Sequence, residues 1–223
     1  MMFSRRMLFS ILGAAMLAAA LDAAPVRASD FVDEARHFIE IKGNETIQVF
    51  GIKDRKTRYD RFRVLLAESF AIKGIAKFVI GRFWNSATPD QKDRYLKLFK
   101  DYIIANYAAK SWIIDDVKLR VARVIENNEN DVSVDTFVHL ADKEKKDVPL
   151  GFRVRKGEKG IKIIDLKVGG VSLIISHRSE FTSVIGKYGG DLNKFNDSLA
   201  ERTKKIEKKA KLNDAKLSEQ QAQ

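Results

Sequence analysis

Residues 132–140 read Val-Ser-Val-Asp-Thr-Phe-Val-His-Leu, so aliphatic residues and one threonine alternate with Ser, Asp, Phe and His. Successive side chains of a strand point to opposite faces, and this period of two predicts a strand with one face on a core. The same period recurs over residues 117–121 and 148–154, and residues 162–168 form a fourth, more apolar run. Polar turns separate the runs, and a bulge is expected near Ala122. The pattern predicts a four-stranded antiparallel meander.

Helical patterns flank this meander on both sides. From residue 30 to residue 112, apolar side chains recur at helical spacing, although the polar residues 42–44 are expected to interrupt the first run. Residues 88–91 (Thr-Pro-Asp-Gln) form a capping box, which predicts a helix that begins there and continues to Lys110. Helices return after the fourth strand. Helices, then strands, then helices indicate an α+β fold.

The N-terminus has the pattern of an export signal. Arg5 and Arg6 precede an apolar run over residues 7–20, and residues 26–28 (Val-Arg-Ala) place small side chains where a signal peptidase cleaves. A membrane span needs about 20 apolar residues, which is more than this run provides. Residues 1–28 are therefore predicted to be a cleavable Sec-type signal peptide, or a Tat-type one because of the paired arginines. The expected location is the periplasm.

Charge and cysteine content narrow the classes of partner. The chain has 41 Lys and Arg against 30 Asp and Glu, a net charge of +11, and it has no cysteine. Outside the cytoplasm such a charge favours phospholipid surfaces and acidic protein patches rather than nucleic acid. Without cysteine there is neither a disulfide nor a lipoprotein anchor, so the mature chain is expected to diffuse freely. We also expect it to be a monomer. The expected domains are the signal peptide, residues 29–202, and a basic tail over residues 203–223 that is helical or disordered.

No motif for catalysis or metal binding is present. The histidines at 37, 139 and 177 lie far apart, and there is no P-loop, no dinucleotide loop and no zinc spacing. We therefore expect no metal and no cofactor. The abundant apolar residues fit a solid core or a hollow one, and a hollow core would bind an apolar molecule.

Two separated blocks of the sequence carry a family resemblance. The first runs from residue 66 to residue 107 and includes residues 82–84 (Arg-Phe-Trp) and 87–91 (Ala-Thr-Pro-Asp-Gln). The second contains Asp165, residues 170–173 (Gly-Val-Ser-Leu) and residues 178–181 (Arg-Ser-Glu-Phe). With these blocks the chain resembles the MlaC-type, toluene-tolerance family of periplasmic phospholipid-binding proteins. It departs from the family at Ile161, where an aromatic residue is usual, and at Gly169, where an acidic residue is common.

The resemblance implies both a fold and a role. It implies a helical layer packed on a twisted four-stranded antiparallel sheet, NTF2-like with a helical subdomain, which encloses an apolar lipid cavity. It also implies a soluble carrier without catalytic activity, whose cargo is phospholipid. Such carriers move lipid between an outer-membrane lipoprotein–porin complex and an inner-membrane ABC transporter with an MCE-domain subunit, and so maintain outer-membrane lipid asymmetry.

On this reading, apolar residues from both layers are expected to line the cavity. These are Ala76, Val79, Phe83, Phe99, Ile103 and Tyr107 from the helices, Val134, Val138, Phe152 and Val154 from the sheet, and Val168, Val171 and Leu173 from the segment that follows. Arg82 and Arg178 are candidates for contacts with the lipid headgroup or with a partner.

Three alternatives stay open at this point. One is a relative that carries a hopanoid or another lipid. Another is an enzyme, for which Asp165 and Tyr107 would be the pair to inspect. The last is a structural envelope protein, which would need only a filled core.

Overall fold

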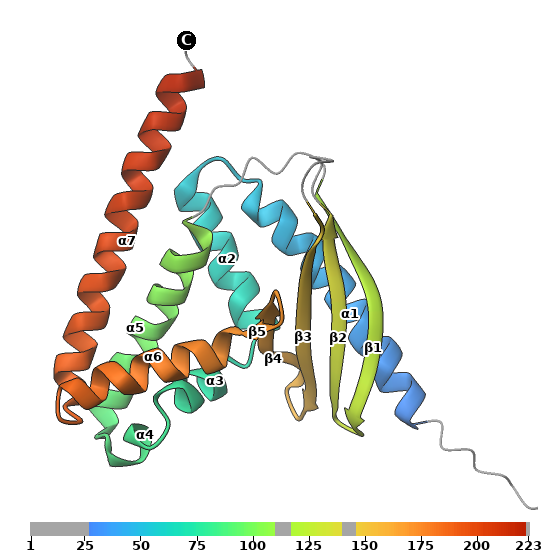
Figure 1. Ribbon diagram of the computed structural model, residues 1–223, viewed down its shortest axis with the longest axis horizontal. Coiled ribbons are helices and arrows are strands. Elements are labelled where there is room, and N and C mark those ends of the chain that lie inside the picture. The colour runs from blue at the N-terminus through green and yellow to red at the C-terminus, as the bar shows by residue number, and fades with distance from the viewer. Residues whose placement is uncertain (1–26, 110–116, 140–145, 222–223) are drawn as a thin grey trace, which may run out of the picture.

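The computed structural model describes residues 27–109, 117–139 and 146–221 (Figure 1). Within these residues, helices precede and follow a single antiparallel sheet. The elements in chain order are α1 (Arg27–Phe50), α2 (Arg55–Ser69), α3 (Ile72–Ile80), α4 (Phe83–Ser86), α5 (Pro89–Ala108), β1 (Lys118–Asn128), β2 (Asp131–His139), β3 (Val148–Gly157), β4 (Gly160–Val168), β5 (Val171–Ser172), α6 (Leu173–Lys187) and α7 (Leu192–Gln221). The predicted α+β class, with helices packed on an antiparallel sheet, is confirmed.

The described part of the sheet has five strands in the order β1-β2-β3-β4-β5, so the predicted number of four is wrong. The additional strand is the two-residue β5, in which Val171 pairs with Val168 across a tight turn. Gly169 and Gly170 form this turn with φ angles of 58° and 83°, which glycine adopts without steric cost. A two-residue strand has too few positions to show a period, which is why the sequence does not reveal it. The bulge expected near Ala122 is confirmed by a register shift at that position of β1.

Helix α5 begins as its capping box predicts. The Thr88 hydroxyl accepts a hydrogen bond from the Gln91 amide at 3.3 Å, and the Gln91 side chain accepts one from the Thr88 amide at 3.0 Å. Near the other end of the helix, the buried Arg58 guanidinium donates from Nε to the Ala108 carbonyl at 2.8 Å. The helix is thus held at both ends. Lys110, the predicted last residue, lies outside the described residues.

Helix α1 is continuous, so the predicted interruption at residues 42–44 is wrong. Gly43 lies inside this helix at its contact with β1, where a Cβ atom would lie 2.9 Å from a methyl carbon of Leu119. The glycine therefore allows α1 to lie close to the sheet. It does not end the helix.

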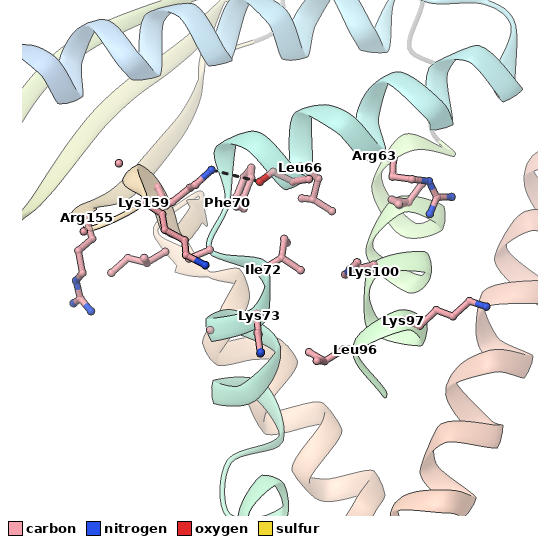
Figure 2. A pocket seen from close by; sticks show the side chains of 18 of the residues that line it. Arg63, Leu66, Phe70, Ile72, Lys73, Leu96, Lys97, Lys100, Arg155 and Lys159 are labelled. Atoms are coloured by element: carbon pink, nitrogen blue, oxygen red, sulfur yellow. Dashed lines mark hydrogen bonds between the residues drawn. The ribbon is translucent and has the colours of Figure 1, made fainter. Parts of the chain in front are cut away.

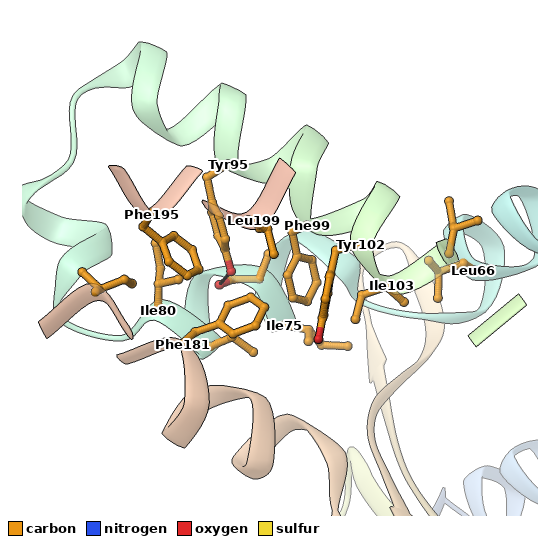
Figure 3. Close-up of a cluster of buried hydrophobic side chains, with 14 of the residues drawn as sticks. Leu66, Ile75, Ile80, Tyr95, Phe99, Tyr102, Ile103, Phe181, Phe195 and Leu199 are labelled. Atoms are coloured by element: carbon orange, nitrogen blue, oxygen red, sulfur yellow. Dashed lines mark hydrogen bonds between the residues drawn. The ribbon is translucent and has the colours of Figure 1, made fainter. Parts of the chain in front are cut away.

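The described residues form two hydrophobic cores. The first lies among α2, α3, α5, α6 and α7, with Tyr95, Phe99, Phe181 and Phe195 at its centre (Figure 3). The second lies between α1 and the sheet and contains Ile39 together with side chains of β2, β3 and β4. Phe70, which follows α2, packs against both. The helical layer and the sheet layer therefore meet along a seam.

The two ends of the chain differ in what the structure describes. Most of the predicted signal peptide, residues 1–26, lies outside the described residues, and the expected cleavage point after Ala28 falls in the first turn of α1. The predicted tail continues α7 up to Gln221, and an Asp214–Arg55 ion pair of 2.9 Å joins this helix to the start of α2. Among the described helices, none is both long and apolar enough to cross a membrane.

Candidate functional site

A cavity of about 300 Å³ lies at the seam between the two cores. Helices α1, α2, α5 and α6 contribute to its wall, and so does the inner face of the sheet. On α5 the lining residues are Phe99, Ile103 and Tyr107, spaced four apart, so a single helix face supplies them. Further apolar lining comes from Ile39, Ile47, Phe50, Phe62, Leu66, Phe70, Ile72, Ile75, Val117, Leu119, Val138, Leu150, Phe152, Ile163, Leu166, Leu173 and Ile174. The wall is thus mainly hydrocarbon, which suits an apolar ligand.

A tyrosine–histidine pair forms the main polar contact of the cavity wall. Tyr107 Oη lies 3.0 Å from His177 Nε2, and His177 Nδ1 lies 3.7 Å from Glu180, which also pairs with Arg202. Burial raises the pKa of the Tyr107 hydroxyl to about 12, so this group remains protonated at neutral pH. Burial lowers the pKa of His177, and Glu180 opposes that effect only in part. The neutral imidazole therefore accepts a hydrogen bond from the Tyr107 hydroxyl, and this pair places no charge at the cavity.

Four further polar side chains line the cavity, and one of them, Thr46, donates from its hydroxyl to the Lys42 carbonyl at 2.6 Å. Asp165 Oδ1 accepts a hydrogen bond of 3.5 Å from the Ile174 amide, so the carboxylate stabilises the N-terminus of α6. Ser69 is buried, and its hydroxyl has no hydrogen-bond partner among the described residues. Lys42, at the edge of the cavity, pairs with Glu45 at 2.8 Å and with Glu68 at 3.3 Å. Asp165 and Tyr107, the pair considered for catalysis, thus each have a different partner.

Six of the predicted cavity residues line this cavity: Phe99, Ile103, Tyr107, Val138, Phe152 and Leu173. The other seven lie elsewhere. Ala76 and Val79 are buried in the helical core, and Phe83 packs at its edge. Val134 and Val154 are buried between α1 and the sheet. Val168 and Val171, which flank the β4–β5 turn, are 39% and 60% exposed.

The predicted headgroup contacts also lie away from the cavity lining. Arg82 is exposed, and its guanidinium lies 5.1 Å from the centre of the Phe83 ring. Arg178 Nη1 donates to the Phe78 carbonyl at 2.6 Å, so this side chain binds the C-terminal end of α3. Neither side chain lines the cavity. Across the described ranges, no three His, Asp or Glu side chains come together as a metal site would require.

Sequence reasoning missed the contributions of α1, α2 and His177 to the cavity. The apolar stripes of α1 and α2 were recognisable from their period, but a stripe does not show whether it faces another side chain or empty space. The small residues within those stripes, Gly43, Thr46 and Ser69, were the signal available. Thr46 and Ser69 leave space that larger side chains would have filled, whereas Gly43 lets α1 lie close to Leu119 of β1.

The fold and the cavity define an α+β protein with a ligand-sized apolar space between a helical layer and a sheet. The family model "MlaC protein" matches residues 45–201, so the chain belongs to the MlaC family. The solved structure of a phospholipid-binding protein from Ralstonia solanacearum, in complex with a phospholipid, has a similar fold with a TM-score of 0.66. The two are 23% identical, and the match covers 77% of this chain and 98% of that one. No curated protein matches the sequence. Membership of the MlaC family points to a binding or transport protein rather than to an enzyme.

Proposed function

We propose that this protein binds phospholipid acyl chains in the seam cavity and carries the lipid through the periplasm. The observation that carries the proposal is the apolar cavity itself, which lies between two separately packed cores. Membership of the MlaC family and the phospholipid bound by the Ralstonia protein support it. Each methylene exposed to water costs about 0.8 kcal/mol, so two chains with about 30 methylenes would cost more than ~20 kcal/mol in free solution. Aqueous transit therefore needs a protein that covers the chains.

The size of the cavity sets a condition on loading. A methylene occupies roughly the ~30 Å³ of a water molecule in the liquid, so a cavity of about 300 Å³ holds about ten of them. That is part of one acyl chain. Two full chains need about three times this volume. The seam is where the structure can supply it, because each buried side chain of the two clusters belongs to only one core and Phe70 is the partly buried residue that packs against both. Loading by phospholipid would thus widen the gap between α1 and the helical layer.

The proposed role includes transfer between membranes. The donor and acceptor would be an outer-membrane lipoprotein–porin complex and an inner-membrane ABC transporter with an MCE-domain subunit, and the transfer would maintain outer-membrane lipid asymmetry. Export would use the signal peptide over residues 1–28. N-terminal sequencing of the protein from a periplasmic fraction tests this part, and a mature chain that still begins at Met1 in the cytoplasm would contradict it.

The cargo can be identified directly. The full chain is expressed with its signal peptide, purified without detergent and extracted with organic solvent, and the extract is analysed by mass spectrometry. We expect phospholipid at near-stoichiometric amounts, and uptake of labelled phospholipid by the delipidated protein. A hopanoid in place of phospholipid would keep the carrier function and change its cargo. A lipid-free protein that also takes up no labelled lipid would refute the proposal.

A further inference from the structure

A second and larger hollow lies on the outer side of the wall of the cavity. This basic groove has a volume of about 1060 Å³ and lies between α2, α3, α5 and the β3–β4 turn (Figure 2). Its floor is apolar and includes Leu96, Ile104 and Ile164. Seven basic and three acidic residues line it, so its charge is strongly positive.

Four lysines of the basic groove are available to a ligand. These are Lys73 on α3, Lys97 and Lys100 on α5, and Lys159 in the β3–β4 turn (Figure 2). All four are exposed, and none forms an ion pair or hydrogen bond within the described part of the chain. They come from three separate elements that surround one apolar floor. Asp93 and Glu158 also line the groove and offset part of this charge, so the net charge around the floor remains positive.

The arginines of the groove, by contrast, already have partners. Arg63 pairs with Asp101 at 3.0 Å, and Arg155 pairs with Asp131 at 2.6 Å. A guanidinium recognises a carboxylate in a fixed bidentate geometry, whereas a lysine acts as a mobile point charge. The four unpaired lysines are therefore better suited to bind several phosphate groups whose positions vary than to bind one defined acidic motif of a partner protein. A lipid headgroup surface has this character.

The groove and the cavity share part of their walls. Leu66, Phe70 and Ile72 line both, so a single layer of side chains separates the two spaces. A surface that occupies the groove would lie one side chain away from the contents of the cavity.

We propose that the basic groove docks the protein on the phosphate headgroups of an anionic phospholipid membrane, which brings the shared wall of Leu66, Phe70 and Ile72 against the bilayer surface. This docking does not depend on what the cavity holds. The contribution of one lysine near an anionic bilayer corresponds to roughly a fivefold change in partitioning. Loss of all four is expected to weaken vesicle binding several hundredfold.

Flotation with vesicles tests the proposal. The wild-type chain and a quadruple variant, K73E/K97E/K100E/K159E, are mixed with phosphatidylglycerol-containing vesicles and with pure phosphatidylcholine vesicles. A matched control, K53E/K77E/K187E/K208E, changes the net charge equally at exposed lysines outside the groove. We expect the wild type and the control to float with anionic vesicles at low salt, the groove variant to stay in solution, and binding to vanish near 1 M salt, where the Debye length is about 3 Å.

Other outcomes would overturn the proposal. Equal loss of binding in both variants would show a general charge effect. If the wild-type protein does not bind anionic vesicles at low salt, the membrane is not the partner of the groove, and an acidic protein becomes the candidate. If the glutamate variant does not fold, as judged by circular dichroism, glutamines at the same four positions replace the glutamates. An I103W variant with a blocked cavity is expected to float like the wild type, which separates failure of docking from failure of the carrier function.

Discussion

Blocking the cavity is the most direct perturbation of the proposed site. Ile103 lines the cavity from the middle of α5 and is 8% exposed. Its replacement by Trp adds about six non-hydrogen atoms, which fill the space of about six of the ten methylenes that the cavity holds. At about 0.8 kcal/mol per methylene, I103W is expected to lose about 5 kcal/mol of acyl-chain binding, which is roughly a thousandfold or more in affinity.

The assay for I103W is the uptake of labelled phospholipid from vesicles by the delipidated protein, followed by native mass spectrometry. The matched control is I175W, which is the same substitution at a position outside the cavity. Ile175 lies on α6 and is 54% exposed. We expect I175W to load as the wild type does. If I103W fails to fold, S69L narrows the same space and removes an unsatisfied buried hydroxyl. Wild-type loading by a folded I103W protein would refute the assignment of this cavity as the lipid site.

Three further predictions concern stability, measured by urea or thermal unfolding. Desolvation raises the pKa of Asp131, but hydrogen bonds from Arg153, Arg155 and Asn127 outweigh this effect and leave the pKa lowered. D131N is therefore expected to lower the free energy of unfolding by roughly 2 kcal/mol at pH 7, and by progressively less as the pH falls below about 3.9. An equal loss of stability at pH 3 would exclude the ionic contribution. Because burial lowers the pKa of His177, the unfolded chain binds a proton more readily, so stability should decline as the pH falls below 6.5, and H177Q should lack this decline between pH 7.5 and 5.5. Gly81 has a φ of 55° and a ψ of −126°, and a Cβ there would lie 3.0 Å from Arg178. G81A is therefore expected to lower the free energy of unfolding by roughly 1–3 kcal/mol. The control is G74A, which has open space around the added Cβ and should leave stability unchanged or increase it.

Most of the fold could be predicted from the sequence because its signals are local. The capping box at Thr88 and Gln91 fixes the start of α5 through hydrogen bonds between residues three apart. The alternation in β2 identifies its buried face in the same way. The continuity of α1 through Gly43 could not be read locally, because it depends on the packing of Leu119 from a distant strand.

The lining of the cavity shows the same limit more clearly. Val134 and Val138 lie on one face of β2, and their local patterns are identical. Val134 is covered by α1 in the second core, whereas Val138 lies farther along the strand and faces the cavity. The path of α1 across the sheet decides between them, and that path is a property of the tertiary structure. Periodicity therefore identifies inward-facing residues but does not separate those that pack against protein from those that line empty space.

The hollow seam itself argues against a purely structural role. Cavity-filling substitutions commonly stabilise a protein by about 0.5–2 kcal/mol each, so a cavity of about 300 Å³ that is lined partly by small side chains has a cost in stability. Thr46 and Ser69 line this space with small side chains, and larger apolar side chains at these two positions would fill part of it. A structural envelope protein gains nothing from such a cost. A carrier gains a binding site, and its ligand restores the lost contacts when it occupies the seam.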